Sequence, residues 1–370
     1  MRLFITGATG VIGQELVREF LKESELHVTV LVHRKTASDG LLQSFFNLPV
    51  AYADRFSAVQ GDVTQLELGL DAAAYEKLCE STHIIHAAAQ TRFDQPIDAI
   101  RTVNVTGTDN VLKLAASCPN LKQAACLSTV FVSGKRTGTI REDELTHNAG
   151  FVNTYEQSKY EMEQLIRNRW KHMPIVTYRL STVVGNSAGT VSMFTAPHQA
   201  LRIMYLGLAA LVPGSDDFVV DLVPSDVIAM NIRKLFLNNF HPGQIYHLVA
   251  GSDKSYRLKE LIDKSYQYLA DLDPSWAARK IMKPIIGSKE AFDLFRKSAE
   301  EAQNPLFSAA LGALSHFSEQ LNFPKIFDQT NTLKELPAYD VPNIDKYYKR
   351  IVECCLNKRW GRNAPTTDTD

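Results

Sequence analysis

Six short apolar runs recur along the first half of the chain, and segments with the periodicity of amphipathic helices separate most of them. The runs are rich in Val, Ile and Leu and cover residues 2–5, 28–32, 56–60, 83–87, 123–127 and 175–180. Strands of this kind, alternating with helices such as 12–22 and 105–116, predict a parallel sheet with both faces covered. The chain is therefore expected to have a doubly wound α/β fold.

The pattern changes after about residue 185. Residues 194–212 read as one apolar helical segment interrupted by Pro197, residues 218–223 as a strand, 227–238 as a helix, and 245–249 as a last strand that returns to the sheet. Beyond Gly251 the chain is mostly helical and amphipathic. We predict a nucleotide-binding domain over 1–190, with 216–250 returning to it. A smaller, mostly helical substrate-binding cap is expected over 191–215 and 251–360, and a disordered polar tail over 361–370.

Composition excludes several classes of protein. The formal net charge of the 370 residues is −1, whereas a nucleic-acid-binding protein usually carries a basic excess.

The start lacks the basic and long apolar regions of a secretory signal, and the most apolar stretch, 204–212, is too short to span a bilayer. Five cysteines show no CxxC pair and no metal-ligand spacing with histidine. We therefore expect a cytoplasmic protein with reduced thiols, no metal site and no nucleic-acid partner.

A glycine-rich turn follows the first apolar run and opens a helical segment. Glycine lets the chain turn tightly and lets backbone N–H groups approach a pyrophosphate, which the positive end of the helix dipole also attracts. Because the turn stands between a strand and a helix at the start of a βαβ unit, it predicts a Rossmann-type dinucleotide site. The residues expected to contact the cofactor there are Thr6, Gly7, Thr9, Gly10, Val11, Ile12 and Gly13.

The spacing of these glycines, TGxxGxxG, resembles that of the short-chain dehydrogenase/reductase superfamily over about residues 1–251. Two further segments agree. Gly61-Asp62-Val63 follows the third strand, where the resemblance implies an Asp beside the adenine ring, although Asp62 alone would also suit a turn. His86-Ala87-Ala88-Ala89 ends the fourth strand, where the resemblance implies a wall of small residues beside the cofactor. These segments add Asp62, Val63, Ala87, Ala88 and Ala89 to the expected contacts.

The end of the second strand favours NADP(H) over NAD(H). An NAD site usually places an acidic residue there to bind both ribose hydroxyls, whereas this chain reads Leu31-Val32-His33-Arg34-Lys35 and has no acid before Asp39. A cation instead offers charge-assisted hydrogen bonds to a 2′-phosphate. We predict NADP(H) as the cofactor, with Arg34 as its main contact and Lys35 or His33 assisting. A solvated basic turn is the alternative.

A tyrosine and a lysine four residues apart open the helical pattern over 155–167. Residues at this spacing share one helix face, so Tyr155 and Lys159 can both point at a bound ring. The lysine is expected to bind ribose hydroxyls and to lower the pKa of the tyrosine, which then donates a proton to a carbonyl oxygen as hydride arrives. Of the thirteen tyrosines, Tyr155 alone has a lysine four positions later.

The resemblance implies roles for further residues. Counting back from Gly134 places Thr129 at the family's active-site serine or threonine, where its hydroxyl would stabilise negative charge on the substrate oxygen; Ser128 is the fallback. Asn104 stands at the start of the fourth helix and is counted among the expected cofactor contacts, as are Tyr155 and Lys159; for its side chain, capping of that helix is favoured over support of the active site. The segment 178–185 corresponds to a loop beside the nicotinamide, although it lacks the usual proline, and it adds Ser181 and Thr182 to the expected cofactor contacts.

Three segments narrow the resemblance to fatty acyl-CoA reductases and thioester reductase domains. They cover residues 221–227, 243–248 and 327–332. The likeness implies NADPH-dependent reduction of an acyl thioester, on CoA or a carrier, to an aldehyde, with hydride attacking the carbonyl directly. The sequence leaves open whether a second NADPH takes the aldehyde on to a primary alcohol. Apolar residues of the segment 194–212 would then line a tunnel for the acyl chain, although periodicity favours ordinary core packing. These residues are Phe194, Leu201, Ile203, Met204, Leu206, Leu208 and Leu211.

Other functions of the same superfamily stay open. One is an NADP-dependent oxidoreductase acting on a ketone or secondary alcohol, and another is a nucleotide-sugar epimerase or dehydratase, which usually prefers NAD. A third is an NADP-sensing protein without activity, which would not need Thr129, Tyr155 and Lys159. The sequence also leaves open a homodimer and peripheral contact with a membrane.

The cofactor prediction can be tested at Arg34. Replacing Arg34 with Asp puts a negative charge where the 2′-phosphate is expected, so the Kd for NADPH should rise far more than the Kd for NADH. Fluorescence titration with both cofactors measures the two changes. An equal effect on NADPH and NADH would refute the assignment.

Overall fold

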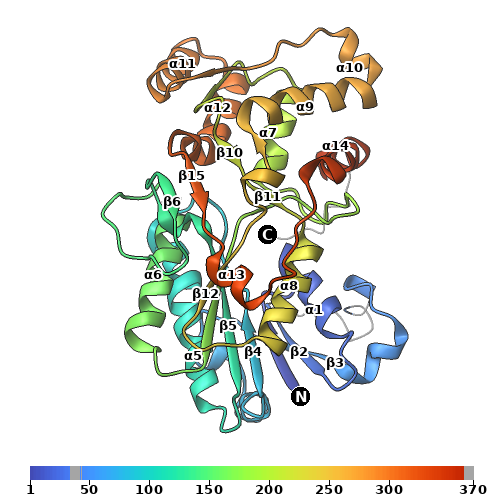
Figure 1. The fold of residues 1–370 in the computed structure, drawn as a ribbon, viewed down its shortest axis with the longest axis vertical. Helices are drawn as coiled ribbons and strands as arrows, with labels where there is room; N and C mark the ends of the chain where they lie inside the picture. Colours follow the sequence, from blue (N-terminus) through green and yellow to red (C-terminus); the bar gives the residue numbers. More distant parts are fainter. Residues whose placement is uncertain (34–41, 43, 362–370) are drawn as a thin grey trace.

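The computed structural model describes residues 1–33, 42 and 44–361, and a parallel sheet forms its centre (Figure 1). The seven strands lie in the order β12-β7-β5-β4-β1-β2-β3, and every neighbouring pair is parallel. This arrangement confirms the predicted Rossmann-type sheet. In chain order the strands are β1 (Arg2–Thr6), β2 (His27–Val32), β3 (Phe56–Gln60), β4 (His83–His86), β5 (Gln123–Thr129), β7 (Ile175–Leu180) and β12 (Ile245–Leu248).

Helices cover both faces of the sheet. On one face α1 (Val11–Phe20) and α8 (Ser225–Asn238) share an apolar core with the strands, and on the other face α3 (Ala72–Leu78), α5 (Gly107–Ser117) and α6 (Thr154–Arg169) share a second core. Strands buried on both faces need apolar residues at nearly every position, which is why the runs stand out in the sequence. The last predicted strand also returns to the sheet, since β12 pairs with β7.

The strand order reverses between β1 and β4. The chain builds β2 and β3 on one side of β1 and then crosses to β4 on the other side, so the crevice at the carboxyl ends of these two strands is a topological switch point. Open α/β sheets bind their ligands at such points. The glycine-rich turn after β1 lies at this crevice.

The helical pattern over 194–212 was predicted as one interrupted segment, and this prediction is wrong. Only α7 (Ala196–Tyr205) is helical, and Pro197 lies in its first turn, where a backbone N–H has no helical partner to lose. The predicted strand over 218–223 divides at the buried Asp221, whose carboxylate accepts hydrogen bonds from the backbone N–H groups of Ala250 and Gly251. Its two halves, β10 (Val219–Val220) and β11 (Leu222–Val223), therefore join different two-stranded sheets.

A mostly helical region lies above the sheet and has its own apolar core (Figure 1). Its helices are α7, α9 (Leu258–Leu272), α10 (Pro274–Ala278), α11 (Lys289–Glu301), α12 (Pro305–Ser318) and α14 (Tyr348–Asn357). Short strand pairs connect parts of the chain that are far apart in sequence: β8 (Thr182–Val183) with β11, β9 (Leu211–Pro213) with β14 (Ile285–Gly287), β10 with β13 (Tyr256–Arg257), and β6 (Gly138–Ile140) with β15 (Lys325–Phe327). Helix α13 (Thr330–Glu335) lies close to β12.

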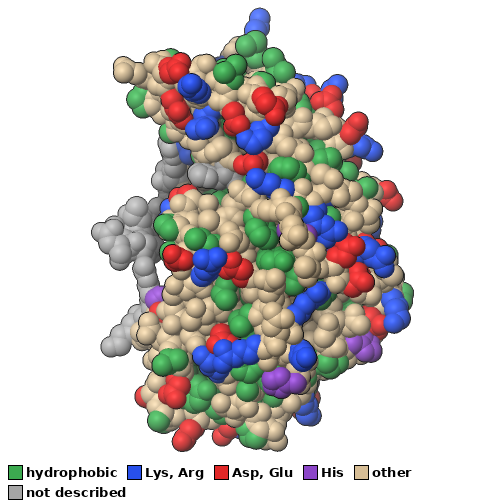
Figure 2. Space-filling model, turned by 90° about the vertical axis from the view of Figure 1, so that its left-hand side faces the viewer, with side chains coloured by type: hydrophobic (Ala, Val, Ile, Leu, Met, Phe, Trp, Pro, Cys, Tyr) green, Lys and Arg blue, Asp and Glu red, His purple; other side chains and the backbone are tan. Residues whose placement is uncertain are grey.

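The surface carries mixed charge. On the face shown in Figure 2, basic and acidic side chains of the described residues alternate over the whole height of the molecule. Within the described part of the chain, none of the helices has the length and apolarity needed to cross a bilayer. Nearly all of the predicted tail, residues 362–370, lies outside the described residues.

One buried ion pair joins α6 to the sheet. The guanidinium of Arg179 on β7 lies 2.7 Å from a carboxylate oxygen of Glu163, and both side chains are buried. Arg179 also donates a hydrogen bond to the carbonyl oxygen of Glu142. Charges removed from water in this way depend on each other, because either one left alone would be buried without a partner.

Replacing Glu163 with Leu should therefore lower the free energy of unfolding by about 3–5 kcal/mol. A matched control is Glu300→Leu, which removes the exposed partner of Arg296 on α11 and should cost less than about 1 kcal/mol. Urea denaturation followed by circular dichroism measures both variants. A similar small loss in the two variants would contradict a structural role for the buried pair.

Candidate active site

The glycine-rich turn packs against the end of β4 at a distance that excludes side chains. Gly7 has a φ of 70°, and a Cβ there would lie 2.4 Å from the carbonyl carbon of Ala87. A Cβ on Gly13 would lie 2.1 Å from the carbonyl oxygen of Gly7. No side chain caps the start of α1, so its first N–H groups can donate to a phosphate. The half-buried residues that leave β4 at this contact are Ala87, Ala88 and Ala89.

Three of the predicted cofactor contacts are turned into the protein. The hydroxyl of Thr6 is fully buried and lies 2.7 Å from Nδ1 of His86, so it joins β1 to β4. Val63 is a buried core residue, and the hydroxyl of Ser181 donates a hydrogen bond to the carbonyl oxygen of Asp221 at 2.9 Å. These three side chains make contacts within the protein at the crevice, and none of them points toward a cofactor.

Asn104 does not cap a helix, which corrects the favoured prediction. It lies within a π-helical turn, Thr102–Thr106, that runs directly into α5. Its buried amide accepts from the backbone N–H of Gln90 at 2.8 Å and donates to the carbonyl oxygen of Gln90 and to the hydroxyl of Ser158. Asn104 thereby ties the loop after β4 to helix α6.

The region expected to bind the adenosine half is described only in part. One oxygen of Asp62 accepts hydrogen bonds from the backbone N–H and the hydroxyl of Thr64, both at 2.8 Å, so Asp62 holds its own turn. Its second oxygen lies 3.8 Å from Nε2 of His33, whose side chain is exposed. Arg34 and Lys35 lie outside the described residues. The assignment of NADP(H) to this turn therefore stays a prediction.

The two hydroxyls predicted as catalytic lie together at the end of β5. Helix α6 begins one residue before Tyr155 because the side chain of Asn153 caps it, accepting a hydrogen bond from the backbone N–H of Glu156 at 3.0 Å. The Tyr155 hydroxyl is hydrogen-bonded to the hydroxyl of Thr129, the last residue of β5. Since parallel strands end at one edge of the sheet, this pair lies at the same edge as the glycine-rich turn.

Lys159 and Glu163 follow Tyr155 on the same face of α6 and also contact β5. The Lys159 ammonium group donates to the carbonyl oxygen of Leu127 at 2.8 Å. Glu163 accepts a hydrogen bond from the hydroxyl of Ser128 at 2.6 Å. Ser128 is thus engaged in the buried ion-pair network, which leaves Thr129 as the hydroxyl beside Tyr155.

The pKa of Tyr155 differs from the prediction. Burial raises this pKa above its ordinary value, the nearby Glu156 carboxylate adds to the rise, and the hydrogen bond with Thr129 opposes it. The Lys159 ammonium group is directed to the Leu127 carbonyl on β5. Burial lowers the pKa of Lys159 itself to about 8, against the charges of Cys126 and Glu163, which raise it. Tyr155 is therefore protonated at neutral pH and can act as a proton donor.

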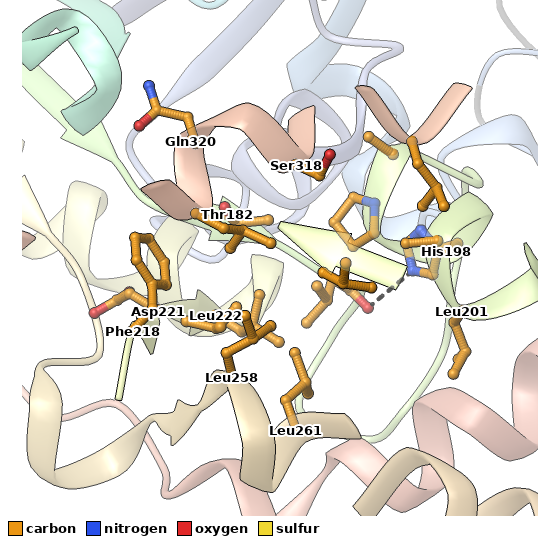
Figure 3. A pocket seen from close by; sticks show the side chains of 18 of the residues that line it. Thr182, His198, Leu201, Phe218, Asp221, Leu222, Leu258, Leu261, Ser318 and Gln320 are labelled. Atoms are coloured by element: carbon orange, nitrogen blue, oxygen red, sulfur yellow. Dashed lines mark hydrogen bonds between the residues drawn. The ribbon is translucent and has the colours of Figure 1, made fainter. Parts of the chain in front are cut away.

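A cavity of about 210 Å³ is lined by Tyr155 and by residues of the helical region. Figure 3 shows Leu222, Leu258 and Leu261 on one side of it and Ser318 and Gln320 on the other. Thr182, one of the predicted cofactor contacts, also lines this cavity. Of the apolar residues predicted to form a tunnel, Leu201 and Met204 line it. The other five are absent from its lining. Four of them pack in or against the core of the helical region, namely Phe194, Ile203, Leu208 and Leu211, and the fifth, Leu206, is exposed.

Three polar residues at the catalytic end of the cavity were not predicted as site residues. Glu156, Gln320 and Lys325 all line the cavity together with Tyr155. Glu156 adjoins the tyrosine in sequence, but nothing in the sequence links it to Gln320 and Lys325 across more than 160 positions. Among the residues that the structure describes, no group of three or more His, Cys, Asp or Glu side chains is placed to hold a metal ion.

A comparison with models of protein families identifies the family of this chain. The family model described as Male sterility protein, an NAD-binding family, matches residues 5–232, which is more than half of the chain. The chain belongs to this family. It is thus an extended short-chain dehydrogenase/reductase with an NAD(P)-binding domain, as the glycine spacing predicted.

Relatives of this family member include a reductase and a peptide synthase. The fatty acyl-CoA reductase wat of Drosophila melanogaster is 23% identical over 316 residues, which cover 73% of this chain and 61% of that protein. One of the linear gramicidin synthase proteins of Brevibacillus parabrevis is 28% identical over 267 residues, which cover 68% of this chain and 5% of that protein. The chain thus spans less than two thirds of the length of either relative.

The crystal structure of the terminal R domain from the myxalamid PKS-NRPS biosynthetic pathway has a similar fold. Its TM-score is 0.79 at 25% identity, and the match covers 97% of this chain and 91% of that chain. The likeness therefore includes the helical region as well as the sheet.

The position of the cofactor can be tested at Gly13. A Gly13→Ala methyl group would collide with the backbone of Gly7, so the variant should bind NADPH at least about tenfold more weakly. Gly312→Ala is the control, because a Cβ at Gly312 on α12 meets nothing within 4 Å. Isothermal titration measures both. Unchanged NADPH affinity in Gly13→Ala would place the pyrophosphate elsewhere.

Proposed function

We propose that the protein uses NADPH to reduce an acyl thioester, on CoA or a carrier, to an aldehyde and then to a primary alcohol. The observation that carries this proposal is that Tyr155, whose hydroxyl interacts with Thr129, lines a largely apolar cavity. Such a site can hold a carbonyl oxygen at the hydroxyls while the attached hydrocarbon lies in the cavity.

The size and lining of the cavity support a chain-like substrate. Pockets for drug-sized ligands usually measure about 300–1,000 Å³, and this cavity is smaller, at about 210 Å³. The hydrocarbon of an acyl group suits a small apolar space better than a fused ring system or a sugar nucleotide does. The apolar wall, with residues such as Leu201, Leu258 and Leu314, also offers few partners for sugar hydroxyls.

The relatives support the same substrate class. The Drosophila relative is by name a fatty acyl-CoA reductase, and the structural relative is by name a terminal R domain from a PKS-NRPS biosynthetic pathway. The first of these names describes the reduction of an acyl thioester. We extend this chemistry to the present chain, whose fold matches the second relative along nearly its whole length.

The roles of the residues follow from their contacts. Bound NADPH would supply the hydride. Tyr155, kept protonated by its raised pKa, donates a hydrogen bond and then a proton to the substrate oxygen, while the Thr129 hydroxyl stabilises the negative charge that develops there. Hydride and proton together convert the thioester to a hemithioacetal. Its C–S bond then breaks, the hydroxyl proton passes to the departing sulfur, and free thiol and aldehyde are released; a second NADPH would supply the hydride for the alcohol. Lys159 stabilises α6 on β5 through the Leu127 carbonyl, and its remaining N–H donors would bind the ribose of the cofactor. Cys126 plays no part, because burial raises the pKa of its thiol to about 12 and hydride attack needs no thiol nucleophile.

The proposed cofactor contacts are the glycine-rich turn, the alanines after β4 and Thr182, with Arg34 binding the 2′-phosphate of NADPH. The helix N-terminus of α1 would bind the pyrophosphate. Asn104 would act indirectly, through the Gln90 loop and α6.

A substrate panel with a Tyr155→Phe variant tests the proposal. Wild-type protein should oxidise NADPH with an acyl-CoA or a carrier-bound acyl group and show little turnover with ketones or sugar nucleotides. Tyr155→Phe removes the proton donor and should lower kcat at least about 100-fold without weakening NADPH binding. Tyr160→Phe is the control, since its hydroxyl on the same helix contacts Gln164. Full activity of Tyr155→Phe, or NADPH consumption with ketones alone, would refute the proposal.

A further inference from the structure

A lysine from the C-terminal part of the chain is buried beside the catalytic tyrosine. Lys325 lies on β15, is 4% exposed and lines the same cavity as Tyr155. A charged side chain is costly to bury, and an apolar residue would fill an apolar cavity wall at lower cost. The burial of this lysine therefore needs a physical explanation, and its contacts supply one.

One contact of Lys325 reaches the turn that carries Thr129. Its ammonium group donates to the carbonyl oxygen of Gly134. The short helical turn Val130–Ser133 begins directly after Thr129 and ends at Gly134, which has a φ of 56°. Because a Cβ on Gly134 would lie 2.1 Å from the carbonyl oxygen of Gly150, this end of the turn is packed tightly. Lys325 thus fixes the far end of the segment whose near end is Thr129.

The other contact reaches the start of the helix that carries Tyr155. Lys325 donates to the amide oxygen of Gln320 at 3.0 Å, and the amide nitrogen of Gln320 donates to the Glu156 carboxylate at 2.7 Å. That carboxylate also accepts from the backbone N–H of Val152 and from the Asn153 side chain, at 3.0 and 3.1 Å. Glu156 is 2% exposed and Gln320 is 7% exposed, so the bridge is shielded from water.

We propose that Lys325 is a positioning residue that clamps the Thr129 turn and the first turn of α6 together, so that the C-terminal region completes the active site. The clamp acts through the Gly134 carbonyl on one side and through the Gln320–Glu156 bridge on the other. The catalytic consequence rests on the proposed function, whereas the clamp itself does not.

The hydrogen bonds of Glu156 within the clamp predict that the activity depends on pH. Ionised Glu156 accepts hydrogen bonds at both oxygens, and protonation would remove one acceptor position. Burial raises the pKa of Glu156 to about 7, and the Lys325 cation lowers it. The charged or titratable groups facing the pair are Tyr155 on α6 and Arg136 in the loop after Gly134. Activity should therefore fall as the pH drops through about 7, and removal of the lysine should move this fall to higher pH.

Hydrogen exchange tests the clamp without any substrate. Lys325→Met should raise the amide exchange rates of both segments, 130–135 and 152–157. Gln320→Leu breaks only the bridge and should raise exchange in 152–157 alone. Lys135→Met is the matched control. Lys135 links the 130–135 turn to Glu319, one residue before Gln320, at 3.3 Å and has no link to Glu156, so this variant should leave the exchange rates of 152–157 unchanged. Wild-type exchange in both segments of Lys325→Met would overturn the proposal.

Kinetics tests the catalytic consequence. With an acyl-CoA substrate, Lys325→Met should lower kcat at least about tenfold, with the KM for NADPH within about twofold of wild type. Its acidic limb of kcat should lie at higher pH than that of wild type, whereas Glu156→Gln should abolish the limb. A merely structural lysine would lower the amount of folded enzyme without moving the limb, and that outcome would overturn the positioning role. If wild type does not reduce thioesters at all, the proposed function fails, and the exchange rates still decide the clamp.

Discussion

Polar contacts between helix α6 and strand β5 fix the relative positions of the catalytic groups. Tyr155, Lys159 and Glu163 lie at successive positions four apart, so they share one helix face. They contact, in the same order, the Thr129 hydroxyl, the Leu127 carbonyl and the Ser128 hydroxyl. Glu163 is in turn anchored by the buried Arg179 on β7. A shift of α6 by one residue along β5 would break all three contacts together, which makes the register of this helix well defined.

The rest of the site depends on what surrounds this helix. The glycine-rich turn lies at the same edge of the sheet because parallel strands all end there, and Asn104 holds the intervening Gln90 loop against α6. The helical region adds the apolar cavity, while β15 and the segment before it bring Gln320 and Lys325 to the start of α6. In the proposed mechanism, the nucleotide-binding sheet therefore supplies the reactive hydroxyls, and the C-terminal region supplies both the substrate space and part of their support.

The sequence predicted those features that depend on local pattern. Strands buried on both faces produce continuous apolar runs, so the seven strands of the main sheet were predicted to within about two residues. The glycine spacing and the Tyr155–Lys159 pair were found because their chemistry requires fixed short intervals. The helix predicted over 194–212 is longer than the observed one because an apolar pattern does not show where a helix ends. Pro197 was interpreted as an interruption, but proline is equally suited to the first turn of a helix.

Contacts between distant segments could not be predicted. The Lys159 ammonium group could reach either a ribose or the sheet, and only the packing of α6 on β5 directs it to Leu127. Asn104 was predicted to cap a helix because a helix start was expected there. In the structure, a π-helical turn continues the helix through this position. Lys325 lies 191 residues from its partner Gly134, and no periodicity connects them.

The most direct test of this account is the fate of the transferred hydride. Wild-type protein would be incubated with an acyl-CoA and NADPH deuterated at C4 of the nicotinamide, once on each face, and the products analysed by mass spectrometry. Direct reduction over Tyr155 and Thr129 predicts deuterium at C1 of the aldehyde or alcohol from one of the two labelled cofactors. An aldehyde or alcohol product without deuterium from either cofactor, or no reduction of the thioester, would contradict the account.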